Sequence, residues 1–319
     1  LEYVPASSEV GDINENINVS DMVKFASDIL TQRNSVTLNA QEALTYSQLV
    51  QVGSSAGGAR AKALIAWNEK TNEIKSGQLN LDKDYDYWLM KFDNVSKNGD
   101  HGVEDIPEYT LIEYAYYKMA IDAGIQMNEC RIYSNNGENH FMTKRFDRVN
   151  GKKIHMQSLG AMAHISYKEP GLCSYEMAAG YMRDVKLPMT DIEQFYSRMV
   201  FNCLAVNQDD HVKNISFLMD RNGEWRLSPA YDITFSYDTT NKWLSAHQMT
   251  INGKKREISL SDILEVGKKM GIKKKKCMDI ISKISIVTSN FEKYADAANI
   301  REKTYVEIRK VLDQNKVEI

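Results

Sequence analysis

A polar stretch of this chain combines side chains that can hold a divalent metal ion and activate an alcohol. Asp209 and Asn214 stand at D-x-x-x-x-N spacing, and Asp232 follows after an apolar segment and a turn. Carboxylate and amide oxygens are ligands that magnesium prefers, and a further carboxylate can accept the proton of an attacking hydroxyl. The spacing is that of a protein-kinase catalytic loop, in which the Asp is the base and the Asn holds magnesium. It predicts magnesium-dependent phosphoryl transfer, with Asp209 as base and Asn214 and Asp232 as metal ligands.

The same loop is also compatible with a simple turn, because Asp, Asn and His favour turns for local hydrogen-bonding reasons. The later carboxylate of Asp232 favours the catalytic interpretation. Two assignments stay open at this stage. Only the spacing to Asn214 distinguishes Asp209 from Asp210 as the base, and His211 either touches phosphate, which would make it part of the catalytic set, or caps the loop.

A lysine in an apolar strand is the candidate phosphate contact. Lys91 lies between a methionine and a phenylalanine, where a cation needs an anionic partner. In protein kinases the strand lysine binds the α- and β-phosphates. Glu113, in the helix predicted next, is the candidate ion-pair partner. The exposed face of an edge strand would explain Lys91 without any function.

The most glycine-rich stretch of the chain covers residues 53–62. Glycine lets the backbone approach an anion closely and point several N–H groups at it. The stretch has neither the G-x-x-x-x-G-K-[ST] pattern nor the G-x-G-x-x-G pattern. Its glycines make it a candidate phosphate loop, but because it matches neither pattern, a plain flexible turn is the alternative.

Predicted strands come first along the chain and predicted helices afterwards. Strands are expected at 63–67, 87–92, 130–133 and 139–146, with a hairpin turn at 134–138, and helices at 109–124, 175–183, 190–206, 260–269, 276–290 and 299–315. Such segregation predicts an α+β protein of two lobes. The smaller lobe, residues 1–158, contains an accessory helix, the phosphate loop and an antiparallel sheet. The larger helical lobe, residues 159–319, carries the catalytic loop.

Composition narrows the class of protein. Of the 319 residues 43% are hydrophobic and 26% charged, values typical of soluble globular domains. No run approaches the roughly 18–20 apolar residues of a membrane span, so we expect a cytoplasmic protein without membrane contact. The four cysteines are isolated from one another, which predicts free thiols. A net charge of −3 disfavours a purely nucleic-acid-binding role, although the basic runs at 254–256 and 273–276 leave local nucleic-acid contact open.

Four ordered motifs resemble those of the HipA-like family of bacterial serine/threonine kinases, which are toxins of toxin–antitoxin pairs. The resemblance spans roughly residues 50–235. Residues 54–62 are similar to the family's S-x-x-G-x-Q-x-K segment, with Arg60 in place of glutamine, and residues 144–148 to its R-F-D-R motif. Residues 207–214 and 231–232 resemble its N-x-D-x-H-x-K-N and Y-D signatures.

The resemblance implies a protein kinase-like fold and roles for individual residues. Asp209 would be the base, Asn214 and Asp232 the magnesium ligands, and Lys91 the phosphate-binding lysine. The implied nucleotide-binding residues are Ala56, Gly57, Gly58, Ala59, Arg60, Lys62, Lys91, Gln157 and Leu159, the last two in a hinge that holds adenine. Ser55, with Ser54 as the neighbouring alternative, falls where family members autophosphorylate.

The resemblance also implies ATP and Mg²⁺ as cofactors and a protein substrate, such as an aminoacyl-tRNA synthetase or another translation factor. The N-terminal subdomain of many family members is expected to be missing, because residues 1–5 resemble the point just after it. Two explanations stay open: a separate antitoxin-like or subdomain polypeptide, as in the shorter HipT-type toxins, or truncation. Two other functions are also compatible with these residues. One is a kinase-shaped corepressor without activity that acts with an antitoxin, and the other is a small-molecule or lipid kinase.

Overall fold

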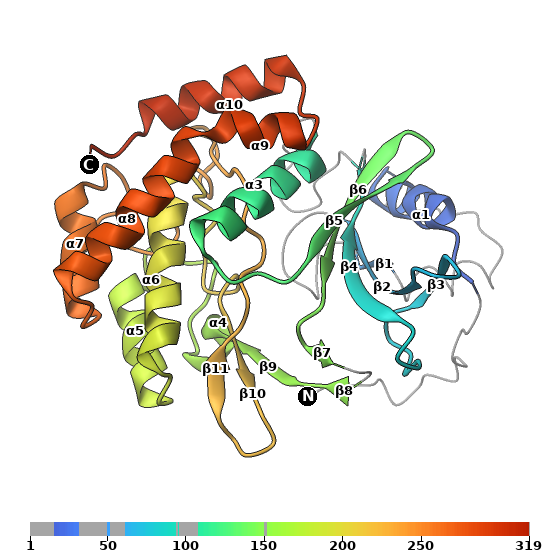
Figure 1. Cartoon of the computed structure of the whole chain (residues 1–319), viewed down its shortest axis with the longest axis horizontal. Helices are drawn as coiled ribbons and strands as arrows, with labels where there is room; N and C mark the ends of the chain where they lie inside the picture. The colour runs from blue at the N-terminus through green and yellow to red at the C-terminus, as the bar shows by residue number, and fades with distance from the viewer. Residues whose placement is uncertain are drawn as a thin grey trace. The chain divides into compact units, whose positions relative to one another are not determined.

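The computed structural model describes residues 16–31, 50–51, 61–93, 95, 108–149 and 152–318. The chain divides into two compact units, whose elements are labelled in Figure 1. The first unit comprises residues up to Leu111 together with Asn128–Ile154, and the second comprises Ile112–Met127 together with His155–Ile319. The predicted lobe division between residues 158 and 159 stays a prediction.

The first unit is built on an antiparallel sheet. Its strands are β1 (Val50–Gln51), β2 (Lys62–Asn68), β3 (Glu73–Ser76), β4 (Asp86–Lys91), β5 (Cys130–Asn135) and β6 (Glu138–Lys144). They are ordered β1-β2-β4-β6-β5, and β3 also pairs with β2. A short ribbon of β7 (Arg148–Val149) and β8 (Lys152–Lys153) follows.

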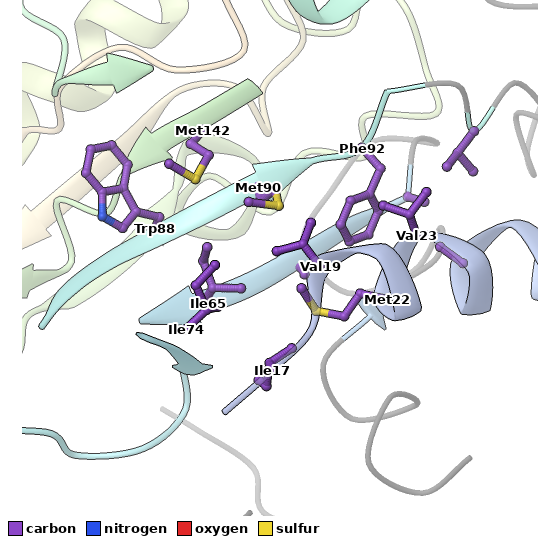
Figure 2. Close-up of a cluster of buried hydrophobic side chains, with 14 residues drawn as sticks. Ile17, Val19, Met22, Val23, Ile65, Ile74, Trp88, Met90, Phe92 and Met142 are labelled. Atoms are coloured by element: carbon purple, nitrogen blue, oxygen red, sulfur yellow. The ribbon is translucent and has the colours of Figure 1, made fainter. Parts of the chain in front are cut away.

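One face of this sheet packs against helix α1 (Val19–Thr31). Figure 2 shows Met22 and Val23 of the helix beside Ile65 of β2, Met90 of β4 and Phe92, which directly follows β4. Because side chains alternate between the two faces of a strand, residues next to these core positions point to the opposite face. The phosphate-binding candidates of β2 and β4 are such neighbours.

The hairpin between β5 and β6 has the predicted turn chemistry. Asn136 and Gly137 adopt φ values of 49° and 83°. A two-residue turn with positive φ at both positions matches the twist of the flanking strands and favours Asn-Gly. The sequence Asn-Gly therefore fixes the register in which Cys130 pairs with Thr143.

The second unit is mostly helical. Its helices are α3 (Tyr109–Ala123, mostly in this unit), α4 (Leu159–Met162), α5 (Tyr175–Asp184), α6 (Met189–Leu204), α7 (Leu260–Lys269), α8 (Lys274–Ser289), α9 (Phe291–Ala297) and α10 (Glu302–Gln314). A small antiparallel sheet is formed by β9 (His155–Ser158), β10 (Ser216–Met219) and β11 (Trp225–Leu227), with β10 in the middle.

Helix α6 is the central helix of this unit. Its residues from Phe195 to Leu204 are buried. Phe201 contacts Tyr116 of α3 edge to face, with ring centroids 6.2 Å apart, and Tyr116 contacts Phe291 in the same manner. A helix held on several sides gives the loop that follows it a rigid starting point.

The predicted fold class is confirmed, since one unit is sheet-rich and the other mainly helical. Helix 260–269 has the predicted bounds, and the helix predicted at 190–206 spans Met189–Leu204. Among the described residues, no helix is both long and apolar enough to cross a membrane. The four cysteines are buried free thiols.

Candidate active site

The loop after helix α6 carries the predicted catalytic residues. Val206, just beyond the helix, has a positive φ of 53°. A β-branched residue rarely adopts this conformation, so the surrounding contacts must hold it. The Asn207 amide donates to the Asn202 carbonyl at 2.9 Å, and the Gln208 amide donates to the Ser236 carbonyl at 3.0 Å. These bonds fix the direction in which the loop leaves the helix.

The two adjacent aspartates of the loop lie in different environments. The side chain of Asp210 is 1% exposed, whereas that of Asp209 is 42% exposed. Asp210 accepts hydrogen bonds from the Tyr175 hydroxyl at 2.8 Å and the Gln248 amide at 2.7 Å, and its Oδ2 lies 2.9 Å from His247 Nδ1. The Asp210 oxygens are thus committed to the interior. This difference favours Asp209 as the aspartate that meets an acceptor.

A buried hydrogen-bond network extends from Asp210 back to the start of the loop. Asn202 donates from Nδ2 to the Tyr175 hydroxyl at 3.0 Å, and Asn207 donates from Nδ2 to Asn202 Oδ1 at 3.0 Å. At the other end, burial lowers the pKa of His247, but the Asp210 carboxylate outweighs it and raises that pKa to about 10. A protonated His247 beside the Asp210 side chain therefore anchors the loop at neutral pH.

Hydrogen bonds to the backbone of the loop hold Asn214 and the neighbour of Asp232 in place. Asn214 donates from Nδ2 to the Asp209 carbonyl at 2.9 Å, which orients its amide group. The Tyr231 hydroxyl donates to the Lys213 carbonyl at 2.7 Å, so the residue before Asp232 is tied to the loop. Asp232 itself has a φ of 52°, a left-handed conformation that Asp tolerates better than most residues.

Asp209, Asn214 and Asp232 line one small pocket of the second unit, with a cavity of about 20 Å³. This volume admits a single water molecule or ion. Within the described part of the chain, no three or more His, Cys, Asp and Glu side chains cluster as a metal site. Mg²⁺ bound to substrate phosphates needs only one or two protein carboxylates, its other ligands being phosphate and water oxygens. The donor set of Asn214 and Asp232 fits such an ion.

Arg198 of α6 lines the same pocket and was not among the residues predicted from the sequence. The residue is 5% exposed, and its Nη2 donates to the Ser228 carbonyl at 2.5 Å. Its Nε and Nη1 are buried and have no hydrogen-bond partner among the described residues. Burial lowers its pKa to about 10, so the group stays charged at neutral pH. A lone arginine within an apolar helix was the signal that could have found it, because a buried cation needs a specific environment.

His211 contacts both the candidate base and an aromatic residue. Its Nε2 lies 3.7 Å from Asp209 Oδ1, and its ring meets that of Tyr167 edge to face, with centroids 5.8 Å apart. Its Nδ1 is buried without a hydrogen-bond partner among the described residues. The Lys213 ammonium lies 3.9 Å from the centroid of the Tyr167 ring.

In the first unit, Lys62 and Lys91 are direct partners across strands β2 and β4. Their exposed fractions are 4% and 7%. Both point away from the α1 core, because the adjacent Ala63 and Met90 belong to that core. The Lys91 ammonium also lies 5.8 Å from the ring centroid of Phe141. Two lysines on one face of the sheet are an arrangement that can bind an anionic ligand.

The R-F-D-R motif forms an ion cluster in the first unit. Arg145 donates from Nε and Nη2 to the two carboxylate oxygens of Asp147, at 2.9 and 2.8 Å, and Arg148 donates from Nη1 to the same carboxylate at 2.8 Å. Burial raises the pKa of Asp147, but the two arginines outweigh it and hold the pKa below its usual value. The motif therefore stabilises the chain where β6 ends.

The remaining candidates take different positions. Gln157 of β9 pairs with Phe217 of β10, and the Leu159 amide donates to the Ile215 carbonyl at 2.8 Å. An adenine that used the Leu159 amide would have to replace that bond. Glu113 is a buried residue of α3. Outside the described residues lie Ser54, Ser55, Ala56, Gly57, Gly58, Ala59 and Arg60.

Sequence comparison relates the chain to one family and one curated relative. The model of the HipA-like C-terminal domain matches residues 54–291. The "Putative kinase" of Haemophilus influenzae is 28% identical over 159 residues, which are 44% of this chain and 46% of that protein. The matched part thus spans about half the length of the curated relative.

Two solved structures share the fold. HipA of Shewanella oneidensis MR-1, in a complex with HipB and operator DNA, has a TM-score of 0.68 and 15% identity, covering 98% of this chain and 72% of that chain. The proinflammatory kinase CtkA of Helicobacter pylori has a TM-score of 0.52 and 15% identity, covering 85% of this chain and 92% of that chain. These likenesses confirm the predicted kinase-like fold class.

Proposed function

Because the chain belongs to the HipA-like C-terminal domain family, we propose that it is a serine/threonine protein kinase that uses ATP and magnesium. The observation that carries this proposal is the shared pocket of Asp209, Asn214 and Asp232. An exposed carboxylate there lies beside two oxygen donors suited to magnesium. The kinase-like fold and the relative from Haemophilus influenzae support the same class of function.

Each residue has a proposed role in the transfer. Asp209 accepts the proton of the acceptor hydroxyl, whose oxygen forms a bond to the γ-phosphorus as the bond to the β–γ bridging oxygen breaks. The electron pair of the broken bond remains on ADP. Asn214 and Asp232 would hold the magnesium ion, which supplies charge neutralisation for the phosphates when bound. Lys62 and Lys91 bind phosphate oxygens, in keeping with two buried cations on one face of the sheet.

Asp210 is excluded from the role of base in this proposal. Its carboxylate is enclosed by Tyr175, His247 and the Gln248 amide. A base must reach the proton that it abstracts. The buried network is instead proposed to fix the backbone from which Asp209 projects.

One of the solved structures suggests a partner for this chain. The similar HipA of Shewanella oneidensis forms a complex with HipB and operator DNA. By analogy, we propose that this chain is a toxin that acts with an antitoxin protein, and that its substrate is a protein hydroxyl. Autophosphorylation at Ser55 or Ser54 remains a prediction of the sequence motif.

The test is transfer of radiolabelled γ-phosphate by the purified chain in the presence of Mg²⁺, with mass spectrometry of the products. Asp209→Asn should abolish transfer and leave ATP binding and the melting temperature unchanged. Asp184→Asn, at an exposed position of α5, is the matched control and should be fully active. Full activity of Asp209→Asn would refute the assignment. Wild-type binding of ATP without any transfer would favour a corepressor instead.

A further inference from the structure

Lys213 is a lysine of the loop that carries Asp209 and Asn214, and it has no role in the reaction proposed above. Its ammonium lies 3.9 Å from the centre of the Tyr167 ring, a distance that gives a favourable cation–π interaction. Within the described part of the chain, the Lys213 ammonium forms no ion pair with a carboxylate. An aromatic ring can position a cation without neutralising its charge. The charge therefore remains available to an anion.

Tyr167 is held in place by the segment that carries it. At one end, the Gly160 amide donates to the Val212 carbonyl at 3.0 Å, and the Ile165 amide donates to the Gly160 carbonyl at 2.9 Å. At the other end, the Gly171 amide donates to the Gln248 carbonyl at 2.7 Å. The segment is thus bonded directly to the loop and to Gln248, whose amide donates to Asp210.

The backbone of Lys213 is fixed as well. Its carbonyl accepts the hydrogen bond of the Tyr231 hydroxyl at 2.7 Å, and the amide of the next residue, Asn214, donates to the His211 carbonyl at 2.9 Å. The His211 ring packs against the same Tyr167 ring. Backbone and side chain of Lys213 are therefore both constrained, which is the preorganisation that electrostatic catalysis requires.

We propose that Lys213 Nζ contacts the phosphoryl group during transfer, with Tyr167 as the positioning residue that holds it. This inference rests on the proposed kinase function. In the transfer, the acceptor oxygen bonds to the γ-phosphorus, the β–γ bridging bond breaks, its electron pair stays on ADP, and the proton goes to Asp209. Lys213 exchanges no proton. Its charge stabilises the equatorial oxygens as negative charge spreads over them.

An acidic side chain of the protein acceptor is the other anion that Lys213 could meet. The phosphoryl group is favoured because Lys213 directly precedes Asn214, the proposed magnesium ligand, and shares its short loop with Asp209. Lys213 lies between Asp209 and Asn214 in the sequence, and its carbonyl is bonded to Tyr231, the neighbour of Asp232. We therefore group its ammonium with the atoms that bind phosphate.

The experiment compares two nucleotide states of the full chain with magnesium, ADP alone and ADP with aluminium fluoride, which mimics the transferring phosphoryl group. Lys213→Met should leave ADP affinity unchanged and weaken the aluminium fluoride complex by about 100-fold or more, as for removal of one oxyanion donor. Unchanged ADP binding also shows that the variant is folded. Lys242→Met is the matched control, because Lys242 lies 4.6 Å from the Trp243 ring centroid and should change neither affinity.

Tyrosine variants test the positioning role. Tyr167→Phe keeps the ring and should behave as wild type, whereas Tyr167→Leu should weaken the aluminium fluoride complex and add little to the loss in Lys213→Met. An equal change in both affinities for Lys213→Met, or a change confined to the KM of an acceptor peptide, would overturn the inference. If the wild type forms no aluminium fluoride complex and transfers no phosphate, the proposed function itself fails and the inference falls with it.

Discussion

Lys62 and Lys91 stand opposite each other on strands β2 and β4, both buried and both on the face away from helix α1. Two lysines at opposite positions of neighbouring strands can both contact one phosphate chain. Binding of a polyphosphate should therefore depend on each of these lysines separately.

Replacing either lysine by methionine should weaken ATP binding. Loss of one charge-assisted hydrogen bond costs about 1.5–3 kcal/mol, or roughly 10- to 100-fold in affinity. Titration with a fluorescent ATP analogue measures this loss. Lys144→Met, on β6 of the same sheet and paired with Asp86, is the control and should bind as the wild type does. Wild-type affinity for ATP in both the Lys62→Met and the Lys91→Met variant would exclude the lysine pair from the nucleotide site.

Replacement by asparagine should lower the stability of the fold strongly at Asp210 and hardly at all at Asp209. Asp210→Asn removes a carboxylate that pairs with protonated His247 in the interior, and breaking such a pair costs about 3–5 kcal/mol. Asp209→Asn should cost almost no stability, because its side chain is partly exposed. Chemical denaturation of the two variants checks this contrast. A stable Asp210→Asn protein would show that the buried network does not anchor the loop.

The His247–Asp210 pair also predicts a pH dependence of stability. The pKa of His247 is raised to about 10 in the folded chain from an ordinary value of 6.5. Its contribution is fully present below pH 6.5 and is lost as the pH rises toward 10. The melting temperature should therefore fall over this range, and it should fall less steeply in His247→Gln. Parallel curves for wild type and variant would mean that His247 is not protonated in the fold.

Two glycines of the second unit should differ in their tolerance of alanine. A Cβ at Gly160 would lie 2.9 Å from Val212 Cγ2 and 3.1 Å from the Ile165 carbonyl oxygen, so Gly160→Ala should cost about 1–3 kcal/mol and disturb the catalytic loop. A Cβ at Gly180, within α5, would meet no atom within 4 Å. Gly180→Ala should be neutral or stabilise the helix by about 0.5–1 kcal/mol. Chemical denaturation and phosphate-transfer assays of both variants test whether Gly160→Ala alone lowers both stability and activity.

Much of the fold could be predicted because local signals agreed with the tertiary structure. The Asn136-Gly137 turn and the apolar periods of α5 and α7 were sufficient to place those elements. Strand β9 was not predicted, because its exposed and half-buried residues have no alternating pattern and its partner β10 lies far along the chain. The predicted helix 299–315 begins only at Glu302, since Asn299 has a φ of 56° and precedes the turn into α10.

The spacing of Asp209, Asn214 and Asp232 was enough to name them as candidates, and the structure places all three around one pocket. The burial of each candidate side chain could not be predicted from the sequence. In the sequence, only the spacing to Asn214 separates Asp209 from Asp210, whereas the buried contacts from Tyr175 and His247 show that Asp210 faces the interior. Arg198 and Tyr167 were missed because their positions depend on tertiary packing: Arg198 lines the pocket from α6, and the Tyr167 ring meets Lys213.

The bond between Asp210 and His247 joins positions 37 residues apart, and the intervening segment contains the exposed turn of Asp220–Gly223 between β10 and β11. The two ends of that segment are therefore held together by an ion pair and by sheet pairing as well as by the peptide chain. A nick at the turn would sever the polypeptide and leave these attachments intact. The second unit is thus suited to reassembly from two fragments, one supplying Asp210 and the other His247.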